Sequence, residues 1–280
     1  MMQGFTDSLS IPKIMGILNV TPDSFSDGGK FHDPISAINH AESLISQGAD
    51  ILDIGAESTR PGSETLDPET EIARLEPVLS GIRTHYKDIP ISIDTRKSLV
   101  VKMCLPYGIQ YVNDISALRH DPDLAGLLGD NPSLRIVLMH MQGEPGSMQD
   151  QPAYKDVLQE VITFFEERIS FCRRNGIEDS QILLDPGIGF GKNLEHNILL
   201  LRSLRTLSQL GFPIVLGASR KRFINEIYSS PPSGRLPGTL AASLSGLLQG
   251  TAIIRVHDVA EHKQFFDVIS RILPEDLWTF

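Results

Sequence analysis

Eight short apolar runs recur along the 280-residue chain, and each ends at a polar or glycine residue before a stretch with helical periodicity. The runs are K-I-M-G-I-L-N-V, I-L-D-I-G-A, I-S-I-D, Y-V-N-D, R-I-V-L-M-H, I-L-L-D, I-V-L-G and I-I-R-V-H. Alternating strand and helix signals predict parallel strands, and eight such units are typical of a closed (β/α)8 barrel, the TIM-barrel architecture. The repeated unit argues against a multidomain split, so residues 1–280 are expected to form a single α/β barrel domain.

The composition indicates which binding partners and which cellular compartment to expect. The formal net charge is −10, which disfavours non-specific binding to nucleic acid or to an anionic membrane. No apolar run approaches the ~20 residues that span a bilayer. The N-terminal segment has no basic stretch followed by an apolar one, and the two cysteines, Cys104 and Cys172, are expected to be inert buried thiols. A cytoplasmic protein that acts on small molecules is the expectation.

Three connections are longer and richer in turn residues than a barrel requires. They comprise residues 20–32, 56–68 and 142–152, and each follows an expected strand. In a (β/α)8 barrel such loops lie at the carboxyl ends of the strands, where long glycine- and proline-rich loops often act as lids or clamps. A fourth irregular stretch, Ser229 to Gly238, interrupts the seventh helical region.

Polar side chains end the third, fourth and sixth runs, at Asp94, Asn113 and Asp185. Since the strand ends of a barrel surround one pocket, we expect these residues to face one another. Two carboxylates and an amide can bond along the edge of a flat heterocycle, and a guanidine-like N–H pattern pairs with a carboxylate through two parallel bonds. The alternative is that each residue caps the helix that follows.

Basic residues gather after the seventh and eighth runs. Lys221 lies in G-A-S-R-K-R, and strand alternation places Arg255 and His257 of R-V-H on the same side. The ends of strands seven and eight form the usual phosphate-binding quarter of such barrels, so this cluster predicts a pyrophosphate site. Solvated surface charge is the alternative for Arg255 and for the neighbouring Arg220 and Arg222.

Asn19 ends the first run beside the expected pyrophosphate. Its amide oxygen would suit Mg²⁺, which takes oxygen ligands and keeps several waters, but a strand-end asparagine is as often a turn-former.

Other chemistries are excluded or disfavoured. The segment L-L-D-P-G-I-G-F-G-K lacks the spacing of a phosphate-binding loop, and its glycines suggest a tight turn that presents Phe190. No Cys or His cluster has zinc spacing. His140 is expected to be a hydrogen-bonding strand end rather than a general base, and Ser58 and Ser219 have no obvious partner for a nucleophilic triad.

Taken together, the motifs resemble the dihydropteroate synthase family. The similar segments are G-I-L-N-V-T-P-D-S-F-S-D-G-G, D-I-G-A-E-S-T-R-P-G, S-I-D-T, N-D-I-S, L-M-H-M-Q-G, L-D-P-G-I-G-F-G-K, S-R-K and R-V-H-D-V. They run from about residue 13 to residue 260 in the family's order, and the first two are long and specific. The resemblance implies a transferase of folate biosynthesis that condenses 6-hydroxymethyl-7,8-dihydropterin pyrophosphate with 4-aminobenzoate, giving 7,8-dihydropteroate and pyrophosphate.

By motif position, the resemblance implies roles for particular residues. The pterin set comprises Asp94, Asn113, Met139, Asp185, Gly217 and Lys221. The pyrophosphate set comprises Asn19, which is also the Mg²⁺ ligand, Thr59, Arg60, Arg255 and His257. The aminobenzoate set comprises Phe25, Thr59, Pro61, Gly62, Phe190, Lys221 and Arg222. The residues expected to carry the chemistry are Asp94, Asp185, Lys221 and Arg255.

Two positions depart from the family pattern. Ala56 stands where the family often has glycine, and Arg222 stands where several members have serine, so the aminobenzoate carboxylate could meet a guanidinium instead of a hydroxyl. The resemblance also implies a homodimer formed through helices far from the strand ends.

Two other functions are alternatives to the synthase. A methyltetrahydrofolate-dependent methyltransferase also binds a pterin in a barrel, but needs neither a pyrophosphate site nor an aminobenzoate loop. A non-catalytic pterin-binding paralogue should have lost loop residues, whereas Asp23, Phe25, Thr59 and Arg60 are all present. We therefore expect a synthase that works by dissociative substitution, in which pyrophosphate departs from a delocalised pterin cation before the arylamine attacks.

Overall fold

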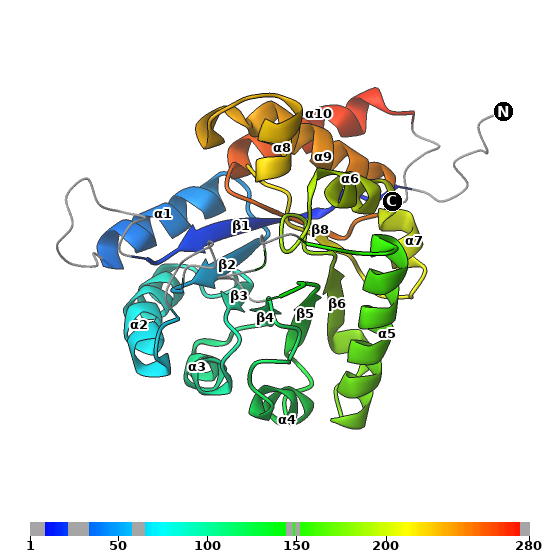
Figure 1. Ribbon diagram of the computed structural model, residues 1–280. Helices are drawn as coiled ribbons and strands as arrows, with labels where there is room; N and C mark the ends of the chain where they lie inside the picture. The colour runs from blue at the N-terminus through cyan, green and yellow to red at the C-terminus, as the bar shows by residue number, and fades with distance from the viewer. Residues whose placement is uncertain (1–8, 22–33, 58–64, 144–147, 149–151, 275–280) are drawn as a thin grey trace.

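The computed structural model describes residues 9–21, 34–57, 65–143, 148 and 152–274 (Figure 1). Its strands are β1 (Lys13–Asn19), β2 (Ile51–Gly55), β3 (Ile91–Asp94), β4 (Tyr111–Asp114), β5 (Arg135–Met139), β6 (Ile182–Asp185), β7 (Val215–Leu216) and β8 (Ile253–Val256). They hydrogen-bond in the order β6-β5-β4-β3-β2-β1-β8-β7, and every pairing is parallel.

The two ends of this sheet meet. A parallel bridge joins Leu184 of β6 to Ile214 beside β7, and the Leu184 amide donates to the Pro213 carbonyl at 3.0 Å. Closing the sheet removes its exposed edges. The predicted (β/α)8 barrel is therefore confirmed.

The helices lie around the outside of the strands (Figure 1). They are α1 (Pro34–Ser46), α2 (Pro68–His85), α3 (Ser98–Cys104), α4 (Asp123–Gly129), α5 (Val157–Arg174), α6 (Leu194–Arg202), α7 (Leu204–Ser208), α8 (Arg222–Ile227), α9 (Leu236–Leu248) and α10 (Val259–Ile272). Among the described residues they are accompanied by the short 3₁₀ helices η2 (Leu105–Tyr107), η3 (Asp179–Gln181) and η4 (Pro232–Gly234). An irregular stretch was expected at Ser229–Gly238. Residues 229–235 do separate α8 from α9 and contain η4, but Leu236–Gly238 already form the first turn of α9.

Side-chain caps explain where several helices begin. Asp67 Oδ1 accepts from the Thr70 amide at 2.7 Å, and Asp156 and Asn193 cap α5 and α6 in the same way. A cap of this kind satisfies one of the amides that the first helical turn leaves without a partner. The apolar stripe of α5 is buried as its spacing predicts, with Val157, Val161, Phe165, Ile169 and Cys172 facing the core.

The interior of the barrel contains its own apolar layer. This barrel floor comprises Met15, Ile51, Tyr111, Val137, Leu183, Val215 and Ile253, one residue from each strand except β3. The strand residues between these positions pack outward into a larger core shared with the helices. Such packing makes the lower barrel a filled core, so a ligand can enter only from the carboxyl ends of the strands.

Both cysteines are buried free thiols, as expected, and burial raises the pKa of the Cys104 thiol to about 12 and that of Cys172 to about 11. Among the helices of the described residues, none combines the length and hydropathy needed to span a bilayer.

Candidate active site

The polar residues of the site form the layer directly above the barrel floor. Side chains alternate along a strand, so the residue two positions after each floor residue returns to the interior. In this way the strands place in one layer Asp53, Asn113, Met139, Asp185, Gly217 and Arg255. Asp94 joins them, because it pairs in register with Asn113 at the end of β3.

Arg255 connects three strands in this layer. Its Nε donates to Asp53 Oδ2 at 2.6 Å and its Nη2 donates to Asp94 Oδ2 at 2.8 Å. Asn113 Nδ2 donates to the same Asp53 oxygen at 3.2 Å. Asp94, Asn113 and Arg255 therefore belong to one hydrogen-bonded cluster around Asp53, and Arg255 is not a solvated surface charge.

The helix-cap alternative does not hold for the three strand-end residues Asp94, Asn113 and Asp185. The N-cap positions of α3, α4 and α6 are occupied by Lys97, Pro122 and Asn193 instead.

Burial and neighbouring charges shift the titration of these groups. Burial raises the pKa of Asp94 to about 7; Arg255 opposes this shift and the Asp53 carboxylate adds to it. Burial also raises the pKa of Asp185. For Arg255, burial acts to lower the pKa, but the attraction of Asp53 and Asp94 outweighs it and the net direction is upward. The layer thus combines a permanent cation with carboxyls poised to gain a proton.

Asp185 and Arg255 both approach Gly217. Asp185 Oδ1 accepts from the Gly187 amide at 2.7 Å. A Cβ added to Gly217 would lie 3.5 Å from Asp185 Oδ2 and 4.0 Å from Arg255 Cδ. Glycine at position 217 therefore keeps the space between the carboxylate and the guanidinium clear.

Lys221 and Phe190 are brought together, as the resemblance implied. The Lys221 Nζ donates to the Ile188 carbonyl and lies 4.1 Å from the centroid of the Phe190 ring. Burial lowers the pKa of Lys221 to about 7, although Asp185 opposes the shift. Phe190 also packs on a cluster that contains Met139. A cation, an aromatic face and a thioether therefore line the same side of the site.

The loop that carries Phe190 turns on three glycines, as expected. Gly187, Gly189 and Gly191 have φ values of 66°, 82° and 59°, a region that glycine adopts at little cost. A Cβ at Gly189 would come within 2.9 Å of Lys221 Cδ. Glycine is needed here both for the turn and for the approach of the lysine.

Lys192 is a buried lysine to which the sequence analysis gave no role, and it holds this loop against the end of β5. Lys192 Nζ lies 3.0 Å from His140 Nδ1, 3.2 Å from the His140 carbonyl and 2.9 Å from the Phe190 carbonyl. Burial and the nearby Lys192 charge lower the pKa of His140 to about 2, so the imidazole is neutral and accepts from the amine. His140 is thus a hydrogen-bonding strand end, as predicted.

His257 follows β8 and pairs with Ser219, the serine for which no partner was expected. Ser219 Oγ lies 2.9 Å from His257 Nδ1 and accepts from the His257 amide at 3.3 Å. The neighbouring carboxylate, Asp258, is engaged by Arg220.

The remaining predicted residues fall into three groups. Asn19 ends β1, is half-buried and pairs in register with Gly55. The Arg222 side chain is 77% exposed, and its Nε lies 2.9 Å from Glu226 Oε1, one turn along α8. The ion pair of Arg222 is therefore formed within its own helix and not with the other predicted site residues. Outside the described residues lie Asp23, Phe25, Ser58, Thr59, Arg60, Pro61 and Gly62.

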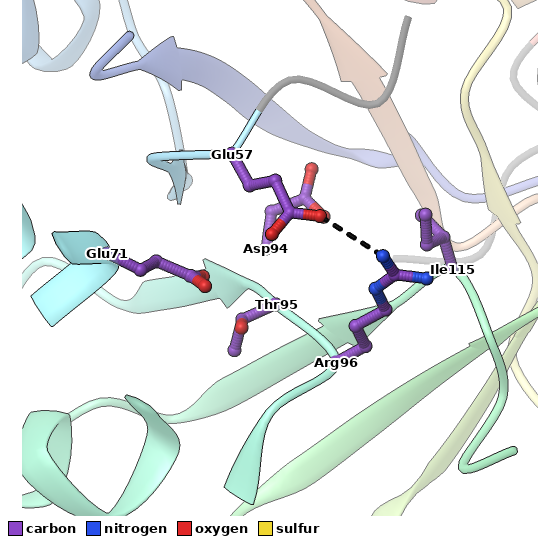
Figure 2. Close-up of a pocket in the computed structure, with 6 residues that line it drawn as sticks. All are labelled: Glu57, Glu71, Asp94, Thr95, Arg96 and Ile115. Carbon is purple, nitrogen blue, oxygen red and sulfur yellow. Dashed lines mark hydrogen bonds and ion pairs between the residues drawn. The ribbon is translucent and has the colours of Figure 1, made fainter. Parts of the chain in front are cut away.

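Asp53 is a site residue that the sequence prediction left out of its sets. The available signal was an acidic residue inside the apolar second run, although Asp53 pairs in register with Ser92, two residues before Asp94. Prediction also missed a buried ionic network beside Asp94. Lys97 bridges Glu57 and Glu71, the latter at 2.7 Å, and Arg96 pairs with Glu57 at 3.3 Å. Figure 2 shows the pocket that these groups share, lined by Glu57, Glu71, Asp94, Thr95, Arg96 and Ile115.

Comparison with known proteins places this geometry in a family. Residues 15–257 match the family of pterin binding enzymes. The dihydropteroate synthase of Escherichia coli K12 is 43% identical over 271 residues, which are 97% of this chain and 95% of the relative. The crystal structure of Yersinia pestis dihydropteroate synthase with a sulfonamide drug complex superposes with a TM-score of 0.88 at 40% identity, covering 96% of this chain and 97% of the other. The Xanthomonas albilineans dihydropteroate synthase with 4-aminobenzoic acid gives 0.87 at 39% identity, covering 96% and 95%. The chain belongs to the pterin binding enzyme family, as a dihydropteroate synthase.

Proposed function

We propose that this synthase holds 6-hydroxymethyl-7,8-dihydropterin pyrophosphate in the barrel mouth and transfers its pterin-methyl group to 4-aminobenzoate. The observation that carries the proposal is the single polar layer in which Arg255 bonds Asp53 and Asp94 while Asp185 and Arg255 both approach Gly217. The Xanthomonas albilineans relative was solved with 4-aminobenzoic acid, which supports the choice of second substrate.

The pterin ring would lie beside Asp185, at the position where Gly217 has no Cβ. A carboxylate whose Oδ2 borders that position can accept two parallel N–H bonds from the guanidine-like edge of the ring. Asn113 offers an amide from the opposite side, and Met139 offers a polarisable face for stacking. Together these groups would fix the plane of the ring and the direction of its methyl-pyrophosphate arm.

The diphosphate arm would then lie toward β8, where Arg255 and His257 supply positive charge and a hydrogen-bond donor. Asn19 fits a role as Mg²⁺ ligand, because an amide oxygen at the half-buried end of β1 is a donor type that this ion accepts. The described residues hold no group of three His, Cys, Asp or Glu side chains suited to a metal, so the ion would draw most of its ligands from diphosphate and water. Bound there, Mg²⁺ would neutralise charge on the leaving pyrophosphate.

A dissociative substitution suits these residues. As the carbon–oxygen bond to pyrophosphate breaks, positive charge spreads over the dihydropterin, and the carboxylates of Asp94 and Asp185 stabilise it. The arylamine is uncharged at neutral pH and attacks the cation without a strong general base; the ammonium that forms then gives its proton to the departed pyrophosphate or to water. Lys221 and Phe190, at the boundary of the pterin site, would position the aminobenzoate and help exclude water, which otherwise captures the cation.

Measuring pyrophosphate release tests the function directly. With dihydropterin pyrophosphate and 4-aminobenzoate together, rapid release and formation of dihydropteroate are expected. With the pterin substrate alone, a slow release that yields hydrolysed pterin is expected if bond cleavage precedes attack. Release that strictly requires the arylamine, with no trace of hydrolysis, would favour direct displacement.

Asp185→Ala and Lys221→Ala test the pterin site. Each variant should bind the pterin substrate at least about tenfold more weakly, because a charge-assisted hydrogen bond contributes about 1.5–3 kcal/mol. Thermal unfolding should show the barrel intact. Normal turnover by both variants would show that the pterin lies elsewhere.

Removal of Mg²⁺ tests the metal role. In excess chelator, pyrophosphate release should stop, and added Mg²⁺ should restore it. Asn19→Ala should raise the Mg²⁺ concentration needed for half-maximal rate. Activity that persists in chelator would remove Asn19 from this role.

The broader setting of the enzyme follows from the family resemblance. We propose that residues 1–280 form one domain, that it works in the cytoplasm as a homodimer, and that Arg222 reaches the aminobenzoate carboxylate when substrate is bound. Sedimentation velocity would measure the oligomeric state. Arg222→Ser should raise the KM for 4-aminobenzoate and leave that for the pterin substrate unchanged.

A further inference from the structure

Arg220 adopts a left-handed backbone conformation although it carries a full side chain. Its φ is 57°, a region that residues with a Cβ rarely occupy, and it lies directly before Lys221. Its amide donates to Thr239 Oγ1 at 3.0 Å, and its carbonyl accepts from Arg235 Nη1 at 3.0 Å. Its guanidinium forms a two-bond pair with Asp258, in which Nε and Oδ2 are 2.9 Å apart. A strained residue held by so many contacts points to a positional requirement.

Asp258 supplies a second, independent observation. It occupies the N-cap position of α10 but makes no side-chain capping bond there. Elsewhere in the barrel, Asp67, Asp156 and Asn193 use their side chains to cap helices. The Asp258 carboxylate, 9% exposed, is directed to Arg220 instead, so α10 forgoes a stabilising cap.

The pair ties together two neighbouring loops of the site. Ser219 bonds His257 at 2.9 Å, and the next residue in each loop, Arg220 and Asp258, forms the ion pair. Two adjacent links therefore join the loop after β7 to the loop after β8. Lys221 follows one end of this double link, and His257 belongs to the other.

We propose that Arg220 and Asp258 are positioning residues that set the separation between Lys221 and His257, and so align the two ends of the dihydropterin pyrophosphate. The inference rests on the proposed function. It assigns the alignment to Arg220 and Asp258, which act on the substrate only through Lys221 and His257. Small displacements of binding groups are costly in a site that must orient a substrate, and a shift of about 1 Å can lower the rate about 100-fold.

Asp258→Asn breaks the ion pair with little change of shape. Its matched control is Asp179→Asn, which breaks another two-bond ion pair. In that pair Arg173 Nε and Nη2 each lie 2.7 Å from an Asp179 oxygen, and Asp179 precedes the amino end of β6, away from the site. For Asp258→Asn, kcat/KM for the pterin substrate should fall about 10- to 100-fold, and the Kd for inorganic pyrophosphate should rise. Because Lys221 is also proposed to position 4-aminobenzoate, the KM for that substrate should rise as well, whereas every constant of the control should stay within about twofold.

Arg220→Gly separates positioning from folding. Glycine adopts the 57° φ without strain, so relief of backbone strain should offset part of the lost ion pair, and the variant should stay folded while losing pyrophosphate affinity. Arg220→Lys should restore part of that affinity, because one charged bond to Asp258 can reform.

Wild-type-like pyrophosphate affinity and kcat/KM in Asp258→Asn and Arg220→Gly would overturn the inference. A wild-type protein that released no pyrophosphate would instead overturn the proposed function. Calorimetry with inorganic pyrophosphate on folded variants tests the double link in either case.

Discussion

At the scale of the residue, the site depends as much on side chains that are missing as on those that are present. Gly217 lies between Asp185 and Arg255, and its lack of a Cβ leaves the space that the pterin is proposed to fill. Asp53 bonds both Arg255 and Asn113, so one buried carboxylate orients two neighbours. The chemistry of the layer therefore follows from volumes and partners, not from any single reactive group.

Gly217→Ala should weaken pterin binding while the barrel stays folded. The added methyl meets its neighbours at 3.5 Å and 4.0 Å, which is ordinary contact, so the stability change should be small. In the liganded site it competes with substrate, and overpacking costs about 1–3 kcal/mol, or roughly tenfold in affinity. The control is Gly126→Ala in α4, where an added Cβ meets nothing within 4 Å. Equal pterin affinities in the two variants would contradict the assigned position of the ring.

Asp53→Asn should shift the acid limb of the pH–rate profile. Asp94 must be ionised to stabilise the pterin cation, and burial raises its pKa to about 7, so kcat/KM should fall as pH drops through this value. The Asp53 charge adds to that elevation, so removing it should lower the pKa of Asp94 and move the limb to lower pH. A limb that stays in place, or moves upward, would show that another group controls it.

At the scale of the element, the helix of each strand–helix unit stabilises the fold, whereas the strand carries the residues of the site. The helices are stabilised by caps and apolar stripes on the outer side, as in α5 with Asp156 and Phe165. The strands deliver polar groups to the inner mouth, where few residues contribute to helix stability. Substitutions in the first set should therefore change stability and leave catalysis unaltered.

Asp156→Ala tests whether the stability of an outer helix and catalysis are independent. The Asp156 side chain accepts from the Gln159 amide at 3.1 Å and starts the 18-residue α5. Losing such a cap costs about 1 kcal/mol of folding free energy. Urea denaturation should show that loss, while kcat and both KM values remain at wild-type levels. A matching fall in kcat would mean that α5 transmits strain to the site.

At the scale of the whole molecule, the closed barrel makes the site rigid by filling the space beneath it. The floor residues pack directly under the polar layer, and Met15 pairs in register with Arg255. Because interiors are packed as densely as organic crystals, a void in the floor has to be filled by movement from above. Stability and site geometry are therefore coupled here, unlike at the outer helices.

Met15→Ala should lower both stability and turnover. Met15 is fully buried, and comparable truncations cost about 2–5 kcal/mol. The cavity should also loosen Arg255, so kcat/KM should fall together with the free energy of unfolding. Met103→Ala, at a position 41% exposed on α3, should change neither by much. Full activity in a destabilised Met15→Ala would show that the floor and the site are independent.

Much of the fold and part of the site could be predicted from the residues alone. The period of eight apolar runs determined the barrel, because alternating strand and helix signals leave few other closed arrangements. The strand-end positions of Asp94, Asn113, Asp185 and Arg255 then followed from topology. Lys221 was predicted from the basic cluster after the seventh run and Phe190 from the glycine turn, and the resemblance placed both in the aminobenzoate set. In the structure the Lys221 Nζ lies 4.1 Å from the centroid of the Phe190 ring.

What the tertiary structure alone decided is which groups touch. No pattern in the sequence pairs Arg255 with Asp53, 202 positions apart, or Arg220 with Asp258, because these contacts depend on the stagger between strands and on the paths of loops. The same holds for Lys192, whose burial beside His140 reflects how one glycine loop folds back on a strand end. Local preferences act within a few residues and determine the elements. Hydrogen bonds between elements require the barrel to close first.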